Sequence, residues 1–356
     1  MRIKSNLSED EFQELSRPKL KLFMSVDIVG STHFKQRESK DRNQNWLNLF
    51  INFFQEFPDL LNTEITGLDS KLPLLRLWKA LGDELIFTVE LKHRKSAVQY
   101  IKALSRTMRK KVRIWHANSD ATLKTLDLKG AAWLVGFPVG NAEIPLISSA
   151  GKDEENSGGT RSDDRDYIGP LVDTGFRVKE YASSRKLALS ADLAYLMLVN
   201  DWDETTMQLF FEGEIPLKGV LQGKPYPIIW LDCHGHPEAE HIASSAEMNR
   251  LRDTFTGKTP AAPASLQTFL KHWLQGTQNL LCIPFIYEDL CDDFPPSPDF
   301  EKCLEASRVE LRKNFYHESP ADEDKAGENT MPQKVSTMIA NILSDPLLSK
   351  AVKTAE

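Results

Sequence analysis

The feature that most constrains this chain is an apolar segment, LKLFMSVDIV at residues 20–29, whose only carboxylate, Asp27, lies near its end. A run of apolar and β-branched residues of this length is typical of a strand buried on both faces. The residues that follow, Gly30, Ser31 and Thr32, end the strand and can open a helix. The segment therefore predicts a buried strand with a carboxylate at its end.

A second pair of apolar segments surrounds a Gly-Asp dipeptide. The segments LLRLWKAL (74–81) and ELIFTVEL (84–91) are separated only by Gly82 and Asp83. Two strand-like segments joined by such a turn are typical of a β-hairpin. We therefore expect Asp83 at a hairpin tip.

The remaining patterns predict an α+β chain in three parts. Residues 1–18 form an N-terminal helix or arm capped at Ser8, residues 19–235 form a mixed domain, and residues 236–356 form a mainly helical, partly flexible extension. We expect helices over 45–61, 96–110, 172–182, 265–275, 300–315 and, more weakly, 338–343. We expect a strand pair within 128–140, strands at 207–211 and 226–231, and a loop over 148–166.

Composition excludes several classes of function. The chain has 356 residues, 41% of them hydrophobic, and a formal net charge of −7, so it can bury a core and has no overall basic field that would attract nucleic acid or an anionic membrane. We expect no signal peptide and no membrane span, since the nearly apolar stretch 131–140 is too short to cross a bilayer. The cysteines form no CxxC pair, which favours reduced thiols and a cytoplasmic location: Cys233, Cys282, Cys291 and Cys303.

The segment SVDIVGST carries chemistry as well as structure. Asp27 offers the hard oxygen ligands that Mg²⁺ and Mn²⁺ prefer. Backbone N–H groups at a helix start bind anions, so residues Val29, Gly30, Ser31 and Thr32 are candidates for phosphate binding. Alternatively, Asp27 only caps the helix.

Asp83 on its own is an ordinary turn residue. In combination with Asp27, it provides a second carboxylate at a strand end beside a phosphate-binding turn. Two such carboxylates suit phosphoryl transfer with two metal ions, in which one ion activates the attacking hydroxyl and the other neutralises the leaving pyrophosphate.

Four motifs resemble those of the class III nucleotide cyclases, the family of adenylyl and guanylyl cyclases. These are VDIVGST, KALGDELIF, YIGPLVDTGFR (167–177) and LKGVLQGKPYPIIWL (217–231), and the resemblance covers residues 19–235. The resemblance implies a ferredoxin-like antiparallel sheet with helices. It also implies a homodimer with two active sites at the interface and a nucleoside triphosphate substrate.

The resemblance also implies roles for individual residues. Asp27 and Asp83, with the Ile28 carbonyl, would bind two Mn²⁺ or Mg²⁺ ions in one site of the dimer. The same subunit would supply the other site with Lys79 and Asp166, which read the base.

Two further residues correspond to the transition-state residues of the family. Arg177 would steady charge on the α-phosphate. Asp173 stands where the family usually has asparagine. An ionised Asp accepts hydrogen bonds but donates none, so Asp173 would orient Arg177 or accept from a sugar hydroxyl.

The base is not decided by Lys79 and Asp166, because adenine, cytosine and uracil all present edges that a Lys and an Asp can satisfy. We expect a lone catalytic domain with a helical tail, and together with the GPLVDTGFR motif this organisation resembles the bacterial pyrimidine cyclases of the Pycsar anti-phage systems. The resemblance implies that UTP or CTP is converted to a cyclic monophosphate that a separate effector protein reads.

Three alternatives remain open from the sequence. The first is a purine cyclase that makes cyclic AMP or cyclic GMP. The second is a dinucleotide synthase, although the GGDEF-type signature is absent and the hairpin has LGDEL instead. The third is a non-catalytic homologue that binds nucleotide, against which the presence of both Asp27 and Asp83 argues.

Overall fold

The computed structural model describes residues 3–40, 45–118, 123–147, 164–200, 202, 207–233, 243–277, 284–290 and 295–316. Its described helices are α1 (Glu9–Ser16), α2 (Ser31–Lys40), α3 (Asn45–Leu68), α4 (Ser96–His116), α5 (Pro170–Lys179), α6 (Ala191–Val199), α7 (Ala243–Thr256), α8 (Pro263–Gly276) and α9 (Phe300–Phe315). Its described strands are β1 (Lys19–Val29), β2 (Arg76–Leu81), β3 (Glu84–Glu90), β4 (Asp127–Phe137), β5 (Ala142–Pro145), β6 (Arg165–Ile168), β7 (Lys186–Leu189), β8 (Leu209–Pro216) and β9 (Pro225–Asp232). All of these elements belong to one compact unit, Met1–His317.

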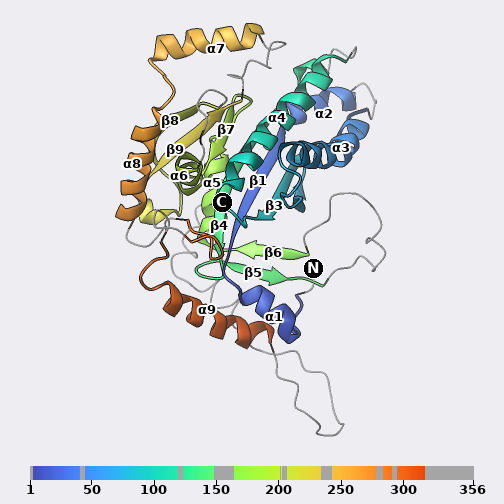
Figure 1. Cartoon of the computed structure of the whole chain (residues 1–356). Coiled ribbons are helices and arrows are strands. Elements are labelled where there is room, and N and C mark those ends of the chain that lie inside the picture. The colour runs from blue at the N-terminus through green and yellow to red at the C-terminus, as the bar shows by residue number, and fades with distance from the viewer. Residues whose placement is uncertain are drawn as a thin grey trace, which may run out of the picture. The chain divides into compact units, whose positions relative to one another are not determined.

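The fold is α+β, as the sequence predicts, with a mainly antiparallel sheet and helices on its faces (Figure 1). The large sheet has the strand order β2-β3-β1-β4-β7-β9-β8, and within it only β4 and β7 pair in parallel. Strands β5 and β6 form a separate two-stranded antiparallel sheet.

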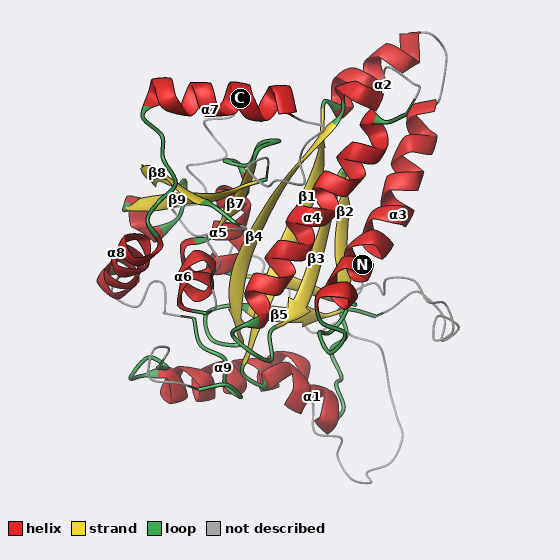
Figure 2. Ribbon diagram, turned by 45° about the horizontal axis from the view of Figure 1, so that its top comes forward, coloured by secondary structure: helices red, strands yellow, loops and turns green. Residues whose placement is uncertain are grey.

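Strand β1 lies between β3 and β4 and is buried along most of its length because both of its faces are covered (Figure 2). On one face, Met24 lies opposite Phe87, whose ring stacks on Phe57 of α3. On the other face, Phe23 stacks on Trp133 of β4. Because successive side chains of a strand point to opposite faces, the apolar residues of β1 pack on both faces of the sheet.

Several predicted elements are confirmed. Ser8 caps α1 in a capping box with Glu11, and the strand predicted at 20–29 is β1. The predicted hairpin is β2 and β3. Helix α9 has the predicted bounds, and α8 lies within two residues of them.

Two expectations about strands are wrong. The segment 128–140 is not a strand pair, because it contains one long strand, β4, that continues to Phe137 as it pairs with β1. The segment 217–231 resembles the closing strand pair of the class III cyclases, but it does not contain both strands of such a pair. Its first half forms a turn, in which Leu221 and Gln222 have positive φ. The strands that pair with β9 are β8 and β7, and both precede this segment.

The helix predicted over 172–182 is α5, which begins at Pro170, a favoured first helical position. Helix α6 was not predicted because it is apolar on all sides and so shows no periodicity. The strand β7 and the helix α7 were not predicted either.

The C-terminal helices pack on the rest of the described chain. Helix α8 contacts α6, and α9 contacts α1. The boundaries predicted at residues 18 and 235 stay predictions, and the helix predicted at 338–343 lies outside the described residues. Among the described helices, none combines the length and apolar character that a bilayer span requires.

Candidate active site

The two predicted metal ligands lie at the same end of the sheet. Asp27 pairs in register with Glu84, the residue that follows Asp83 at the hairpin tip. Asp27 Oδ2 lies 2.9 Å from Nζ of Lys129, its neighbour on β4. Asp83 accepts a hydrogen bond from the hydroxyl of Ser31, the first residue of α2. Register and hairpin geometry therefore place both carboxylates beside the predicted phosphate-binding turn.

That turn has the backbone that a strand-to-helix transition needs. Val29 is the last residue of β1, and Gly30 has a φ of +85°, a conformation that glycine adopts without strain. Phe34 N–H donates to the Gly30 carbonyl, which closes the first turn of α2. The first backbone N–H groups of a helix have no partner within it, so those around Thr32 are available to an anion.

The donor set fits a divalent cation only in part. Among the described residues, no group of three or more His, Cys, Asp or Glu side chains could hold a metal ion. Asp27, Asp83 and the Ile28 carbonyl are the ligands predicted at this end of the sheet. Mg²⁺ is commonly bound by one or two carboxylates together with substrate phosphates, so these residues fit an ion that arrives with a nucleotide.

The structure brings Lys79 and Asp166 together. Lys79 Nζ lies 2.7 Å from Asp166 Oδ1, although one residue lies on β2 and the other on β6. The side chains are 37% and 18% exposed, so the pair is accessible from solvent. The loop predicted over 148–166 is wrong at its end, because Asp166 belongs to β6, and residues 148–163 lie outside the described residues.

Asp173 and Arg177 lie on α5. Among the described residues, no hydrogen bond or ion pair joins either of them to the carboxylates at the strand end or to the Lys79–Asp166 pair. Asp173 is exposed, and Arg177 Nη1 lies 3.0 Å from Glu180 Oε1 on the same helix. The close packing of α5 on the sheet requires Gly175, because a Cβ there would lie 2.3 Å from the Trp133 ring. The helix start is held by Asn141, whose Oδ1 accepts from Leu171 N–H at 3.0 Å.

Helix α5 is also tied to the hairpin tip by charge. Lys179 Nζ lies 2.9 and 2.7 Å from the two carboxylate oxygens of Glu84. Glu84 adjoins Asp83 and lies opposite Asp27, so one ion pair joins the helix of Arg177 to the end of the sheet that carries both carboxylates.

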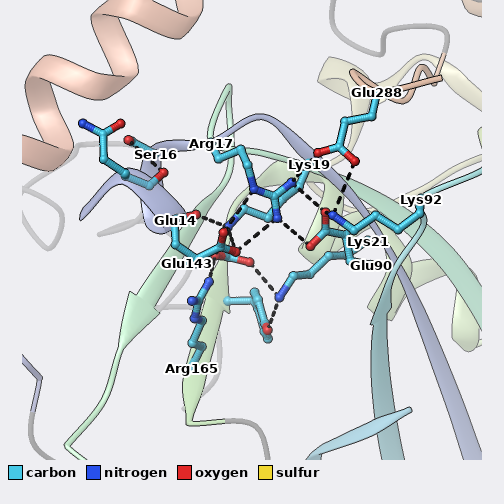
Figure 3. Close-up of polar contacts among 12 residues, drawn as sticks. Glu14, Ser16, Arg17, Lys19, Lys21, Glu90, Lys92, Glu143, Arg165 and Glu288 are labelled. Atoms are coloured by element: carbon cyan, nitrogen blue, oxygen red, sulfur yellow. Dashed lines mark hydrogen bonds and ion pairs between the residues drawn. The ribbon is translucent and has the colours of Figure 1, made fainter. Parts of the chain in front are cut away.

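A buried charge cluster holds β6 next to β1 (Figure 3). Its centre is Glu143 on β5, whose side chain is 1% exposed. Glu143 lies 2.9 Å from Lys19 Nζ and 2.8 Å from Lys21 Nζ, and it also pairs with Arg165 of β6. Lys21 donates to the Tyr167 hydroxyl at 2.7 Å. Asp166 thus lies between two residues, Arg165 and Tyr167, that this cluster fixes.

The cluster changes the acidity of its central carboxyl. Burial alone would raise the pKa of Glu143, but the charges of Lys21, Lys19 and Arg165 outweigh burial and lower the pKa from 4.5 to about 2. A pKa lowered by folding contributes stability that is fully present above pH 4.5 and is lost as the pH falls to about 2.

We expect Glu143→Gln to lower the free energy of unfolding by about 3 kcal/mol at pH 7, because three cations would lose their buried counter-charge. Urea unfolding at pH 7 and at steps down to pH 2 measures this. The difference from the wild type should narrow below pH 4.5, where the wild type also loses the charge. Glu288→Gln is the matched control, because its carboxylate is 53% exposed and lies 3.6 Å from Lys92. Equal effects of the two variants would contradict the prediction.

Sequence reasoning missed Glu143, Asn141, Lys129 and the Glu84–Lys179 pair. Each acts through a contact across the fold, such as the Lys19–Glu143 contact between residues 124 positions apart. Nothing in the local sequence marks these residues, since a carboxylate in a short polar strand is common. Only the sheet register shows which charges meet.

Comparisons with known proteins give similarity in structure only. No protein-family model matches this sequence, and no curated protein matches it. The chain is similar in structure to the adenylyl cyclase CyaB from P. aeruginosa, with 17% identity over 60% of this chain and 94% of that chain and a TM-score of 0.42. It is also similar to the guanylyl cyclase Cya2 (14% identity, 61% and 93% coverage, TM-score 0.42). A third is the guanylate cyclase domain of RhGC from Catenaria anguillulae in complex with GTP (11% identity, 60% and 97% coverage, TM-score 0.39).

Proposed function

We propose that this chain is a nucleotide cyclase that converts a nucleoside triphosphate to its 3′,5′-cyclic monophosphate and pyrophosphate. The observation that carries the proposal is the contact between Lys79 and Asp166, a donor and an acceptor 2.7 Å apart at an accessible position. Such a pair can read the edge of a base. The same chain places Asp27 and Asp83 together at a strand end beside a turn suited to phosphates.

Each residue has a defined task in this proposal. Asp27, Asp83 and the Ile28 carbonyl would hold Mn²⁺ or Mg²⁺. These ions would lower the pKa of the attacking hydroxyl and neutralise the charge of the leaving pyrophosphate. The backbone of Val29, Gly30, Ser31 and Thr32 binds the β- and γ-phosphates.

The task of α5 is to stabilise the transition state. Arg177 donates to the α-phosphate as negative charge builds up there. Asp173, which lies one helical turn before Arg177 and is exposed, accepts from a ribose hydroxyl or orients Arg177. Both side chains would act in the site to which the partner subunit contributes Asp27 and Asp83.

A homodimer with shared sites is part of the proposal. What supports it is that Arg177 and Lys79 are 41% and 37% exposed, and that within one chain the only described ion pair of Arg177 is the local one with Glu180. Side chains that bind charge at a surface can complete a site on a second copy of the chain.

We further propose that the substrate is a pyrimidine triphosphate, UTP or CTP. The cyclic product would then be a second messenger that a separate effector protein reads in anti-phage defence. What supports this is the GPLVDTGFR motif, which contributes to the resemblance to the Pycsar cyclases.

We expect UTP or CTP to be turned over in preference to ATP and GTP when all four compete at equal concentration with Mn²⁺. A site that forms hydrogen bonds with the edge of one base rejects other bases, because these leave polar groups of the site without hydrogen-bond partners. Mass spectrometry of the products measures the preference. A dominant cyclic AMP or cyclic GMP product would overturn the pyrimidine proposal but not the cyclase proposal, and a dinucleotide or no product would overturn both.

Lys79→Ala tests the base-reading pair in the same assay. It should reduce the preference between bases as well as the rate, since it removes a group that contacts the base. Lys92→Ala is the matched control: Lys92 is also a part-exposed lysine beside a strand, 41% exposed, and it pairs with Glu90 at 2.8 Å. If both variants keep the wild-type preference, Lys79 does not read the base.

A further inference from the structure

An irregularity in β2 directs two neighbouring side chains to the same place. Leu77 pairs with Phe87 and Lys79 with Ile86, so Trp78 is an extra residue in a β-bulge. In a regular strand, adjacent side chains point to opposite faces, whereas a bulge can turn both to one face. Here both contact Asp166: Lys79 Nζ at 2.7 Å and Trp78 Nε1 at 3.1 Å.

The contacts of Asp166 are concentrated on one of its oxygens. Besides the Lys79 ammonium and the Trp78 indole, the backbone N–H of Tyr167 donates to Oδ1 at 2.9 Å. Within the described part of the chain, no hydrogen bond or ion pair involves Oδ2. With Oδ1 fully engaged, the carboxylate presents Oδ2 as its available acceptor.

The Trp78 indole is itself held in place. Its ring lies edge-on to Phe23 and to Tyr167, with centroids 5.3 and 5.2 Å apart, and 6.1 Å from the ring of Phe176 on α5. Lys79 Nζ lies 4.6 Å from the centre of the same ring, a cation–π distance. A side chain packed on several sides has one orientation, so its N–H has a fixed direction.

The Asp166 side of the arrangement is equally fixed. Arg165 and Tyr167 on either side of it are held by the Glu143 cluster described above (Figure 3). The two elements that carry the base-reading pair thus meet through Trp78. Its indole is the one uncharged side chain among the described donors to Asp166.

We propose that Trp78 is a positioning residue for base recognition: by binding Oδ1 of Asp166, it orients the carboxylate so that Oδ2 accepts from an N–H of the substrate base. This rests on the proposed function, in which Lys79 and Asp166 read the base. When Lys79 turns toward the base, Trp78 keeps the carboxylate from rotating. A carboxylate free to rotate could meet the wrong base equally well, so Trp78 contributes to selectivity more than to rate.

The chain provides a matched pair of variants. Trp78→Phe keeps an aromatic ring but removes the N–H donor. Trp133→Phe makes the same change in a tryptophan of the same aromatic cluster, and Trp133 Nε1 is buried without a hydrogen-bond partner in the described structure. Both variants lose similar packing, and only the first loses the contact with Asp166.

The experiment uses the full chain and two readouts. One is kcat/KM for each of ATP, GTP, CTP and UTP with Mn²⁺. The other is the equilibrium affinity for each triphosphate with Ca²⁺, which does not depend on turnover. We expect Trp78→Phe to lower the ratio between the best and the worst triphosphate by about tenfold, the effect of losing a hydrogen bond to a charged group. The ratio should stay at the wild-type value in Trp133→Phe.

Each outcome decides the matter. Equal ratios in both variants, or a Trp78→Phe variant that loses kcat alike for every triphosphate, would overturn the role of Trp78 while the cyclase proposal stands. If the wild type binds with a base preference but makes no cyclic product, the affinity ratios still decide the role of Trp78, and the cyclase proposal falls. If the wild type binds no triphosphate, both fall. Should Trp78→Phe not fold by circular dichroism, Trp78→Met, which also lacks the N–H donor and fills the space with a flexible side chain, is compared with Trp133→Met in the same way.

Discussion

Asp27→Ala or Asp83→Ala should lower the rate of cyclic nucleotide formation by about a thousandfold or more while leaving the fold intact. Each carboxylate is proposed to hold a cation that balances the pyrophosphate charge, and the neighbouring carboxylate of Glu84 is already bound through both oxygens by Lys179. The fold should tolerate the change, since Asp27 is 24% exposed and its contact is with Lys129, which is 39% exposed. Product formation with Mg²⁺ and with Mn²⁺ measures the loss, and thermal unfolding measures the fold.

The control for this prediction is Asp59→Ala on α3. Asp59 is an exposed carboxylate far in sequence from both motifs, so its removal should leave the rate within twofold or so, as for other surface substitutions. Near-normal rates in Asp27→Ala or Asp83→Ala with either metal would show that the two-metal assignment is wrong. A second check is binding: both variants should lose the Mn²⁺ dependence of nucleotide affinity.

Mixing Asp83→Ala with Arg177→Ala should restore activity that neither variant has alone. If sites are shared across a dimer, each mixed dimer has one site with both defects and one intact site. Random exchange makes about half of the dimers mixed, so recovery should reach up to about a quarter of the wild-type activity. The assay is product formation after exchange, with exchange itself verified by two different affinity tags.

The structure offers a sharp control for this experiment. Asp27→Ala mixed with Asp83→Ala should restore nothing, because both residues lie at one end of one subunit's sheet and would act in the same site. Lys79→Ala mixed with Arg177→Ala should also fail. Recovery in all three mixtures, or in none when exchange is complete, would contradict shared sites.

Local patterns were enough to predict the elements whose physics is local. The strand β1 and the β2–β3 hairpin follow from apolar runs around a Gly-Asp turn, and α1 follows from its capping box. Helix α6 could not be found in this way, because a helix buried on all sides has no polar stripe. The segment 128–140 was expected to form a strand pair, whereas β4 runs unbroken from Asp127 to Phe137 because it pairs with β1 along its whole length.

The same distinction between local and distant contacts applies to the candidate site. Residues within motifs could be named from the sequence. The contact between Lys79 and Asp166 was implied only by the family resemblance, because these two residues are 87 positions apart in the chain. Trp78 could not be named, because its role comes from a bulge that no local rule predicts. Glu143 could not be named either, as its importance depends on three cations from other strands.

The central position of β1 has a consequence for how the chain is made. Both strands that cover its edges, β3 and β4, follow it in the sequence. At about 5–20 residues per second, the roughly 100 residues between β1 and the end of β4 take about 5–20 s to leave the ribosome. Throughout that interval β1 is a nearly apolar strand with an unpaired edge, a form in which nascent segments aggregate or bind chaperones. The residue on which the proposed chemistry depends, Asp27, thus lies in a strand that is made before both of its partners.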